Sequence, residues 1–146
     1  HKAFAVLSYT LPGMPLIYTG QETGMNRAFE FFVKDEAPQW EPRNEYFTFY
    51  QTLNRLKHTN RALLAGEQGG KMVRYPTTSP DLYAFSRIVG DDAVLVMVNL
   101  GAKAQKVKFT GEAPSVENLI NLFTGDVAKL PKKLNPGEYL VFIQAK

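Results

Sequence analysis

A short apolar run followed at once by two polar residues is the first place in this sequence where chemistry could be centred. In the stretch LPGMPLIYTGQE, residues 11–22, prolines and glycines bracket the run 15–18, and Gln21 and Glu22 come directly after it. A run that is apolar on both faces is typical of a strand in a parallel sheet. Side chains just past the carboxyl end of such a strand line the binding sites of barrels and open sheets. Gln21 and Glu22 are therefore candidates for ligand contact, and the alternative for Glu22 is a structural acceptor of backbone N–H groups or of an arginine.

The remaining reactive side chains do not converge on a second site. There is no cysteine, which excludes disulfides, thiolate metal sites and cysteine nucleophiles. His1 and His58 have no companion residues at metal-ligand spacing, and Asp91 and Asp92 follow Gly90 as turn residues do. No nucleophile and general base can be assembled, so we expect no catalytic residue and no metal site in this chain.

The totals describe one or two compact domains without a membrane or nucleic-acid partner. The 146 residues are 45% apolar and 21% charged, which is enough apolar material for a buried core. No apolar run approaches the roughly 20 residues that a membrane-spanning helix needs. The net charge is +3, but the lysines are scattered and lack the interleaved aromatic residues of a nucleic-acid-binding face.

Two patterns of apolar spacing divide the chain near residues 64–70. Helical spacing predicts one helix over residues 3–11, which must stop before Pro12, and a second helix that Asn44 can cap. After Gly66 the period changes to two, and turn signals separate short strands. The expected strands cover 71–75, 82–88, 93–100, 105–109, 116–121 and 138–143, with a further short one at 127–130. Six to seven such strands predict an antiparallel β-sandwich, so the expected fold class is α+β.

These pieces, taken in order, resemble the C-terminal part of the alpha-amylase superfamily of glycoside hydrolases. TLPGMPLIYTGQE, residues 10–22, resembles the segment that forms the eighth strand of the family's (β/α)8 barrel. YFTFYQTLNRLKHTNRALLAG, residues 46–66, resembles the last barrel helix, and DLYAFSRI, AVLVMVNL, NLFTGD and LNPGEYLVF resemble the β-sandwich that follows the barrel. The resemblance covers essentially the whole chain. It implies two domains, the end of the catalytic (β/α)8 barrel at 1–65 and the C-terminal all-β sandwich at 66–146.

The resemblance also implies what the larger enzyme does and what this chain lacks. The family cleaves or transfers at α-glucosidic bonds with retention, using a nucleophilic and a proton-donating carboxyl group about 5–5.5 Å apart. In the family these groups follow earlier barrel strands, so they would precede His1, and this chain has no NHD-like stretch. We therefore expect an inactive piece of an alpha-amylase-like glycosidase or transglycosidase. It completes the barrel, with the upstream barrel of the same chain as its partner, and carries the structural sandwich.

Under this resemblance Gln21 and Glu22 lie at the barrel rim, where contact with the α-glucan substrate is implied and catalysis is not. No cofactor is implied in this stretch, although the resemblance allows calcium in the larger enzyme. The aromatic residues of the following loop have two interpretations, a platform on which sugar rings stack or the small core of their own loop, and the second is favoured. They are Phe29, Phe31, Phe32 and Trp40.

Two other functions stay open. An independent carbohydrate-binding module predicts a line of exposed aromatic residues on one sandwich face and binding of maltooligosaccharides tighter than millimolar. A complete small enzyme predicts turnover of an α-glucoside. In every case the apolar faces of residues 3–11 and 15–18 need partners. If the chain exists alone, we expect them to pack on the sandwich, to pair with another copy, or to give up the parallel-strand geometry.

Overall fold

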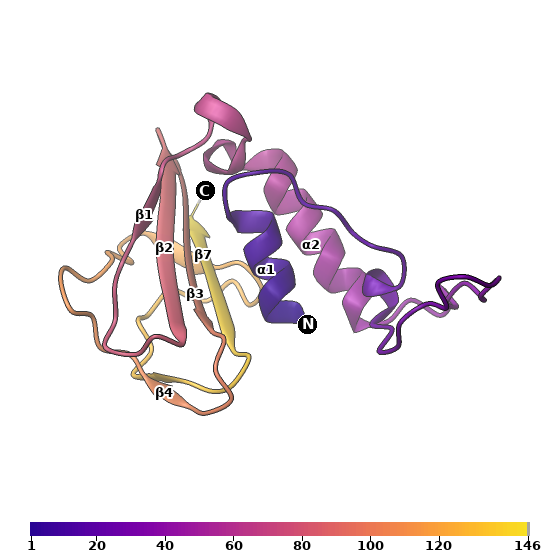
Figure 1. The fold of residues 1–146 in the computed structure, drawn as a ribbon. Coiled ribbons are helices and arrows are strands. Elements are labelled where there is room, and N and C mark those ends of the chain that lie inside the picture. The colour runs from indigo at the N-terminus through magenta and orange to yellow at the C-terminus, as the bar shows by residue number, and fades with distance from the viewer. Residues whose placement is uncertain (146) are drawn as a thin grey trace.

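The computed structural model describes residues 1–145 and places two helices against one face of an antiparallel sheet (Figure 1). The helices are α1, Lys2–Thr10, and α2, Glu45–Thr59. The larger sheet has the strand order β1-β2-β3-β7-β5, and β4 pairs with β6 in a second, two-stranded sheet. The strands are β1 Met72–Arg74, β2 Leu82–Val89, β3 Asp92–Asn99, β4 Gln105–Lys106, β5 Leu119–Asn121, β6 Lys133–Leu134 and β7 Tyr139–Gln144. Two helices followed by antiparallel sheets of five and two strands confirm the expected fold class.

The two longest strands, β2 and β3, form a hairpin within the larger sheet. Gly90 turns the chain with a φ of 56°, a left-handed conformation that glycine adopts without a steric penalty. Pairing then covers the whole of both strands, and β7 pairs with the other edge of β3. Strand β3 therefore lies in the middle of the sheet, with its backbone groups bonded on both sides.

Both faces of β3 are also buried, which explains why AVLVMV, residues 93–98, is continuously apolar. Val94, Val96 and Val98 pack into the cluster that includes the two helices. Leu95 and Met97 point to the opposite face and pack in two smaller clusters beneath the chain between β3 and β7. A strand of an antiparallel sheet usually alternates apolar and polar residues because one face meets water. This strand does not alternate because helices cover one face and loops cover the other.

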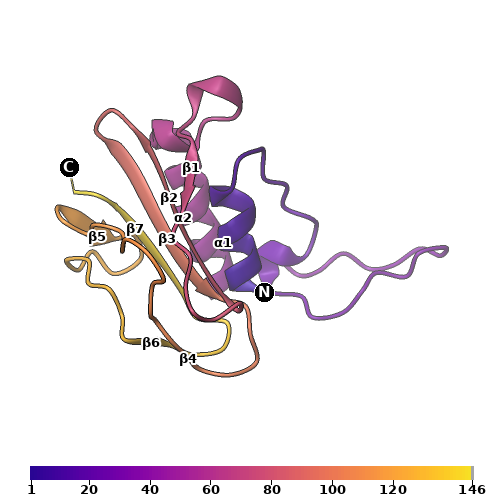
Figure 2. The same ribbon diagram turned by 60° about the vertical axis from the view of Figure 1, so that its left-hand side comes forward.

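The helices lie side by side on the sheet and share one core with it (Figure 2). Val6 and Leu53 are fully buried in that core, and the Tyr9 hydroxyl donates to Asn54 Oδ1 at 2.7 Å. Asn44 begins α2 as expected, because its Oδ1 accepts from the first backbone N–H groups of the helix. Among residues 1–145, no helix has the length and hydropathy needed to cross a bilayer.

A buried arginine joins the end of α1, the linker after α2 and strand β2. Arg87 is 2% exposed. Its Nε donates to the Gly70 carbonyl at 2.8 Å, its Nη2 to Leu64 at 3.0 Å, and its Nη1 to Thr10 and Leu11 at 3.2 and 3.3 Å. Burial lowers the pKa of its guanidinium group, which nevertheless stays charged as arginine does in proteins. One side chain therefore fixes three segments that are far apart in the sequence.

The expectation of a buried strand at residues 15–18 is wrong. The segment belongs to no strand, and the side chains of Leu16 and Tyr18 are 77% and 64% exposed. Ile17 alone of the run's large side chains packs against the core. The physical reason is pairing, because a strand needs a neighbour for its N–H and C=O groups and no described strand lies beside this segment. Of the three outcomes expected for the apolar faces, α1 packs on the sheet and residues 15–18 give up the strand geometry.

The short strands also differ from the sequence expectation. The strand expected at 127–130 is reduced to a single bridge between Val127 and Ile120, and the strand expected at 105–109 ends after two residues. Strand β5 starts three residues later than expected, after Asn118, whose φ of 58° is left-handed and interrupts an extended backbone. Strand β6 was not expected at all. Such pairings depend on distant partners, so the local apolar pattern says little about them.

Candidate functional site

The candidate residues lie on η1, Gln21–Thr23, a single 3₁₀ turn after the exposed apolar run. Gly20 and Gly24 flank the turn with φ values of 98° and 71°, which side chains other than glycine rarely adopt. A Cβ on Gly24 would lie 2.3 Å from the Tyr46 ring, so the turn packs closely on the first turn of α2. This turn directs the two candidate side chains into different clefts.

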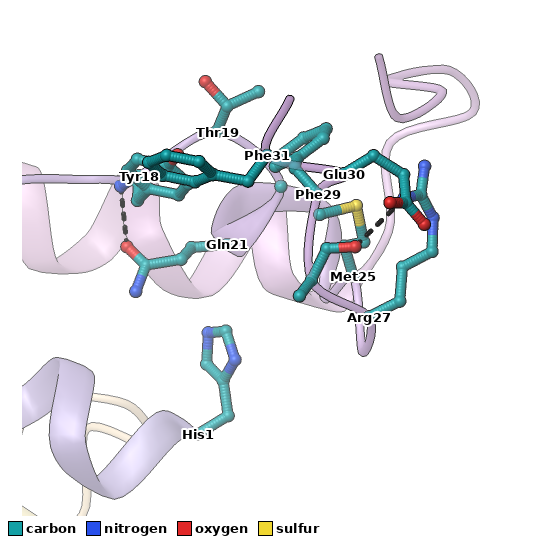
Figure 3. Close-up of a pocket in the computed structure, with 11 residues that line it drawn as sticks. His1, Tyr18, Thr19, Gln21, Met25, Arg27, Phe29, Glu30 and Phe31 are labelled. Atoms are coloured by element: carbon teal, nitrogen blue, oxygen red, sulfur yellow. Dashed lines mark hydrogen bonds between the residues drawn. The ribbon is translucent and has the colours of Figure 1, made fainter. Parts of the chain in front are cut away.

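Gln21 lines a pocket of about 540 Å³ together with aromatic side chains from the same stretch (Figure 3). Its Oε1 accepts from the Tyr18 backbone N–H at 2.8 Å. Its amide nitrogen has no hydrogen-bond partner within residues 1–145 and points to the side of the pocket where His1 lies (Figure 3). Phe29 meets the Tyr18 ring edge-on, with the ring centroids 6.3 Å apart. The pocket therefore offers a free amide donor beside two aromatic rings.

Glu22 faces a second cleft, of about 390 Å³, and both of its carboxylate oxygens are used within the protein. Oε2 accepts from the Gly20 backbone N–H at 2.9 Å, and Oε1 accepts from Trp40 Nε1 at 2.6 Å. Close by, Asn44 Nδ2 donates to the Thr23 carbonyl at 2.7 Å. These bonds fasten the two ends of the intervening loop to the start of α2. Glu22 therefore anchors that loop, and its contact with substrate stays a prediction.

His1 borders the Gln21 pocket and contacts the first half of α2. Its Nε2 lies 3.0 Å from the Tyr50 hydroxyl oxygen, and its ring meets the Tyr46 ring edge-on at 5.3 Å. Burial raises the pKa of Tyr50 to about 12. Tyr50 therefore keeps its proton throughout the neutral range and acts as a hydrogen-bonding group, not as a base.

The loop of residues 24–43, called the arm below, projects beyond the start of α2 (Figure 1). Phe31 and Phe32 are 87% and 94% exposed near its tip, and Trp40 is 49% exposed near its base. The favoured expectation, that the aromatic residues form the loop's own small core, is therefore wrong for Phe31 and Phe32. The arm has no second layer of chain that could cover these rings, and only Phe29 is half-buried.

The described residues form neither a metal site nor an exposed aromatic face on the sheet. Within residues 1–145, no three His, Asp or Glu side chains gather so that they could hold a metal ion. The aromatic residues of the long strands are buried or half-buried, and Phe85, for example, is fully buried. The line of exposed aromatic residues that a carbohydrate-binding module predicts is thus absent from these strands.

No family model matches this chain, but individual proteins do. It is 30% identical over 111 residues to the alpha-amylase MalA of Haloarcula japonica, a match that covers 73% of this chain and 16% of that protein. It is 31% identical over 122 residues to neopullulanase 2 of Thermoactinomyces vulgaris, covering 80% of this chain and 20% of that protein. The chain thus spans about a fifth or less of the curated relatives that it matches.

Solved structures match the fold. The maltogenic alpha-amylase AmyB from Thermotoga neapolitana superposes with a TM-score of 0.77 at 18% identity, over 97% of this chain and 35% of its own. The alpha-amylase of Geobacillus thermoleovorans, solved in complex with acarbose, gives 0.70 at 17% identity, over 99% of this chain and 33% of its own. The sequence matches and the fold agree. Over most of its length this chain is a homologue of alpha-amylase family glycoside hydrolases, and it corresponds to a minor part of each of them.

Proposed function

We propose that this chain supplies the closing part of an alpha-amylase-type enzyme that cleaves or transfers at α-glucosidic bonds of α-glucans. In this proposal residues 1–65 are the last βα unit of the barrel and residues 66–146 are the C-terminal sandwich. The upstream barrel of the same polypeptide carries the catalytic carboxylates. The chain by itself hydrolyses nothing, and its role is to close the barrel and to join it to the sandwich.

The observation that carries this proposal is the exposed apolar segment before η1. Met14, Leu16 and Tyr18 are 82%, 77% and 64% exposed, and a cleft of about 490 Å³ beside them is lined mainly by apolar side chains. Large contiguous apolar surfaces of this kind mark places where another surface docks. A neighbouring barrel strand would cover these side chains and supply partners for the backbone groups of Leu16 and Ile17, which belong to no strand here.

The joint between barrel and sandwich is the shared core of the helices and the sheet. Phe49 of α2 stacks on Phe123, with the rings inclined by 12°, and meets Tyr139 of β7 edge-on. Arg87 adds hydrogen bonds from β2 to the end of α1. An interface this apolar fixes the relative orientation of the parts it joins. The sandwich therefore acts as a rigid support for the last barrel helices.

Substrate contact belongs to the Gln21 pocket in this proposal. The free amide nitrogen of Gln21 can donate to a sugar hydroxyl, and the rings of Tyr18 and Phe29 can pack against the apolar face of a sugar. Support comes from the Geobacillus thermoleovorans homologue, which was solved with acarbose. At the barrel rim of this proposal, Glu22 holds the turn and the arm in place. If Glu22 contacts the sugar, the contact is made by its carboxylate.

An activity assay tests the central claim that this chain is catalytically silent. The 146-residue protein is incubated with maltoheptaose and with a chromogenic α-glucoside, and the products are separated by chromatography. We expect no product above the buffer control, because in this proposal the catalytic carboxylates lie on the upstream barrel. The pocket itself has one lining carboxyl group, that of Glu30, where retaining cleavage needs two. Turnover that co-purifies with the protein and scales with its concentration would overturn the proposal.

A further inference from the structure

Within the arm, residues 27–36 form a clasped loop whose two ends are fastened together. The Asp35 carboxylate accepts from both terminal nitrogens of Arg27, at 2.7 and 3.0 Å. It also accepts from the backbone N–H groups of Glu30 and Glu36, at 2.8 and 2.7 Å. A bidentate arginine–carboxylate pair is stronger and more specific in geometry than a single hydrogen bond. The clasp therefore fixes the backbone on both sides of the tip.

The clasped loop holds three consecutive apolar residues in solvent. Phe31, Phe32 and Val33 are 87%, 94% and 64% exposed. The two phenyl rings meet edge to face, with their centroids 4.9 Å apart and an interplanar angle of 77°. Such a contact uses the edge of one ring and one face of the other, so both rings keep an open face. A fixed backbone that keeps apolar rings exposed is typical of a binding surface.

The charges around the tip favour an uncharged ligand that carries hydroxyl groups. Arg27 and Lys34 stand against Glu30, Asp35 and Glu36, which gives the clasped loop a net charge of 2 − 3 = −1. A negative surface disfavours anionic membranes and nucleic acids. Within residues 1–145, the Glu30 and Glu36 carboxylates have no hydrogen-bond or ion-pair partner. Open aromatic faces next to free carboxylate acceptors suit the apolar faces and the hydroxyl groups of sugar rings.

The tip is also continuous with the Gln21 pocket, since Phe31 lines that pocket and precedes Phe32 (Figure 3). We propose that the clasped loop is a stacking platform that extends the Gln21 pocket and selects longer α-glucan chains. This inference rests on the proposed function, because it takes the pocket as a sugar site. A short sugar occupies the pocket alone, whereas a longer chain continues over Phe31 onto Phe32.

The Arg27–Asp35 pair stays ionised in mild acid. Hydrogen bonds from Arg27 and from backbone N–H groups hold the pKa of Asp35 well below its ordinary value of 3.8. A carboxyl group whose pKa is lowered by folding contributes its stabilisation above the ordinary pKa and loses it only as the pH falls through the lowered one. We therefore expect the Arg27–Asp35 clasp to hold the tip at pH 7 and still at about pH 4, the edge of the ordinary range of the Asp carboxyl group.

The experiment compares two sugars on the ¹⁵N-labelled 146-residue protein by NMR titration. Maltose is expected to shift the signals of Tyr18 and Gln21 only, whereas maltoheptaose also shifts those of the tip residues. Stacking on one more ring predicts an affinity for maltoheptaose about 5-fold above that for maltose. Phe32→Ser lowers the ratio of the two affinities to near one, and Asp35→Asn lowers it because the tip is no longer held. Val127→Ser, which removes an exposed apolar side chain elsewhere (73% exposed), leaves the ratio unchanged.

The outcomes separate this inference from the proposed function. Shifts at Gln21 with maltoheptaose but none at the tip, or an unchanged ratio in a folded Phe32→Ser protein, overturn the platform and leave the pocket as a sugar site. No shift at Gln21 with either sugar removes the sugar site of the proposed function itself. Tip signals that move with protein concentration in the absence of sugar identify a second copy as the occupant and also overturn the platform.

Discussion

Arg87 keeps its charge in a buried site by donating only to backbone carbonyls. Its partners are the last residues of α1 and two points of the linker after α2. Carbonyls at a helix end carry partial negative charge and have no partner inside the helix. A guanidinium group suits this place because its donors form a planar fork that can reach several acceptors at once. The side chain thus satisfies carbonyls at the end of α1, as a helix cap does, and also holds three segments of the chain together.

Replacing Arg87 by methionine should therefore destabilise the protein strongly. Arg87→Met keeps the length and apolar stem of the side chain but leaves buried carbonyls without donors, which is expected to cost about 3 kcal/mol of unfolding free energy. Urea unfolding followed by circular dichroism measures the loss. The control is Arg55→Met on the exposed face of α2, where the change should stay within about 0.5 kcal/mol. If Arg87→Met also lowered the unfolding free energy by no more than about 0.5 kcal/mol, water would have replaced the hydrogen bonds of Arg87.

Residues differ in how far the sequence reveals their roles. Asn44 was predicted as a cap because its partners are its next neighbours along the chain. Arg87 was not predicted, since an arginine in an alternating strand reads as exposed and its acceptors lie up to 77 residues away. The pair Arg27 and Asp35 was also missed, because eight residues in an irregular stretch carry no fixed geometry. A sequence shows local hydrogen bonds and hides those that only the fold brings together.

At the scale of elements, α2 is the piece on which the site depends. Its first turn supports η1, and Asn44 serves both, capping the helix with Oδ1 and holding the Thr23 carbonyl with Nδ2. The amide therefore couples the start of the helix to the base of the arm. Movement of this helix end would move the pocket and the arm together.

The two bonds of Asn44 can be separated by substitution. Asn44→Ala loses the cap and should lower the unfolding free energy by about 1 kcal/mol. Asn44→Asp keeps an acceptor for the helix N–H groups, adds a charge that the helix dipole favours, and loses only the bond to Thr23. We expect thermal unfolding to place Asn44→Asp near the unsubstituted protein. Equal losses in both variants would mean that the Thr23 bond, and not the cap, carries the effect.

Elements were predictable to different degrees for a physical reason. The three long strands β2, β3 and β7 match the expected ranges closely, because their apolar patterns are long. The short edge pieces do not, since two or three residues pair only where a distant partner happens to lie. The segment 15–18 reads as a strand from composition alone, yet a strand exists only beside another strand. Its apolar composition therefore predicts a strand that the described residues do not form.

At the scale of the whole molecule, the sheet side and the helical side differ in how much apolar surface they expose. The sheet is covered on both faces, whereas the outer side of the helical layer carries the exposed apolar segment and its clefts. Leu16 and Ile17 are neighbours that face opposite ways, Leu16 to solvent and Ile17 to the core. Substitutions at Leu16 and at Ile17 can therefore test the proposed docking surface and the buried core separately.

Serine at each of these two positions should give opposite results. Leu16→Ser should reduce the binding of a hydrophobic dye and change the unfolding free energy by less than about 0.5 kcal/mol. Ile17→Ser should leave dye binding largely intact and cost about 1–2 kcal/mol, because part of a packed side chain is lost. Fluorescence and urea unfolding on the same samples give both numbers. Dye binding that does not respond to Leu16→Ser would place the open surface elsewhere.

The arrangement of α1 on the sheet has a consequence for synthesis. Helix α1 packs against β3 and β7, and its last carbonyls are held by a side chain 77 residues further on. A ribosome makes the helix first and β7 last, at about 5–20 residues per second. During those seconds the nascent helix can contact α2, as in the hydrogen bond from Tyr9 to Asn54, but it lacks its contacts with β7, so part of its apolar face stays uncovered until the final strand emerges.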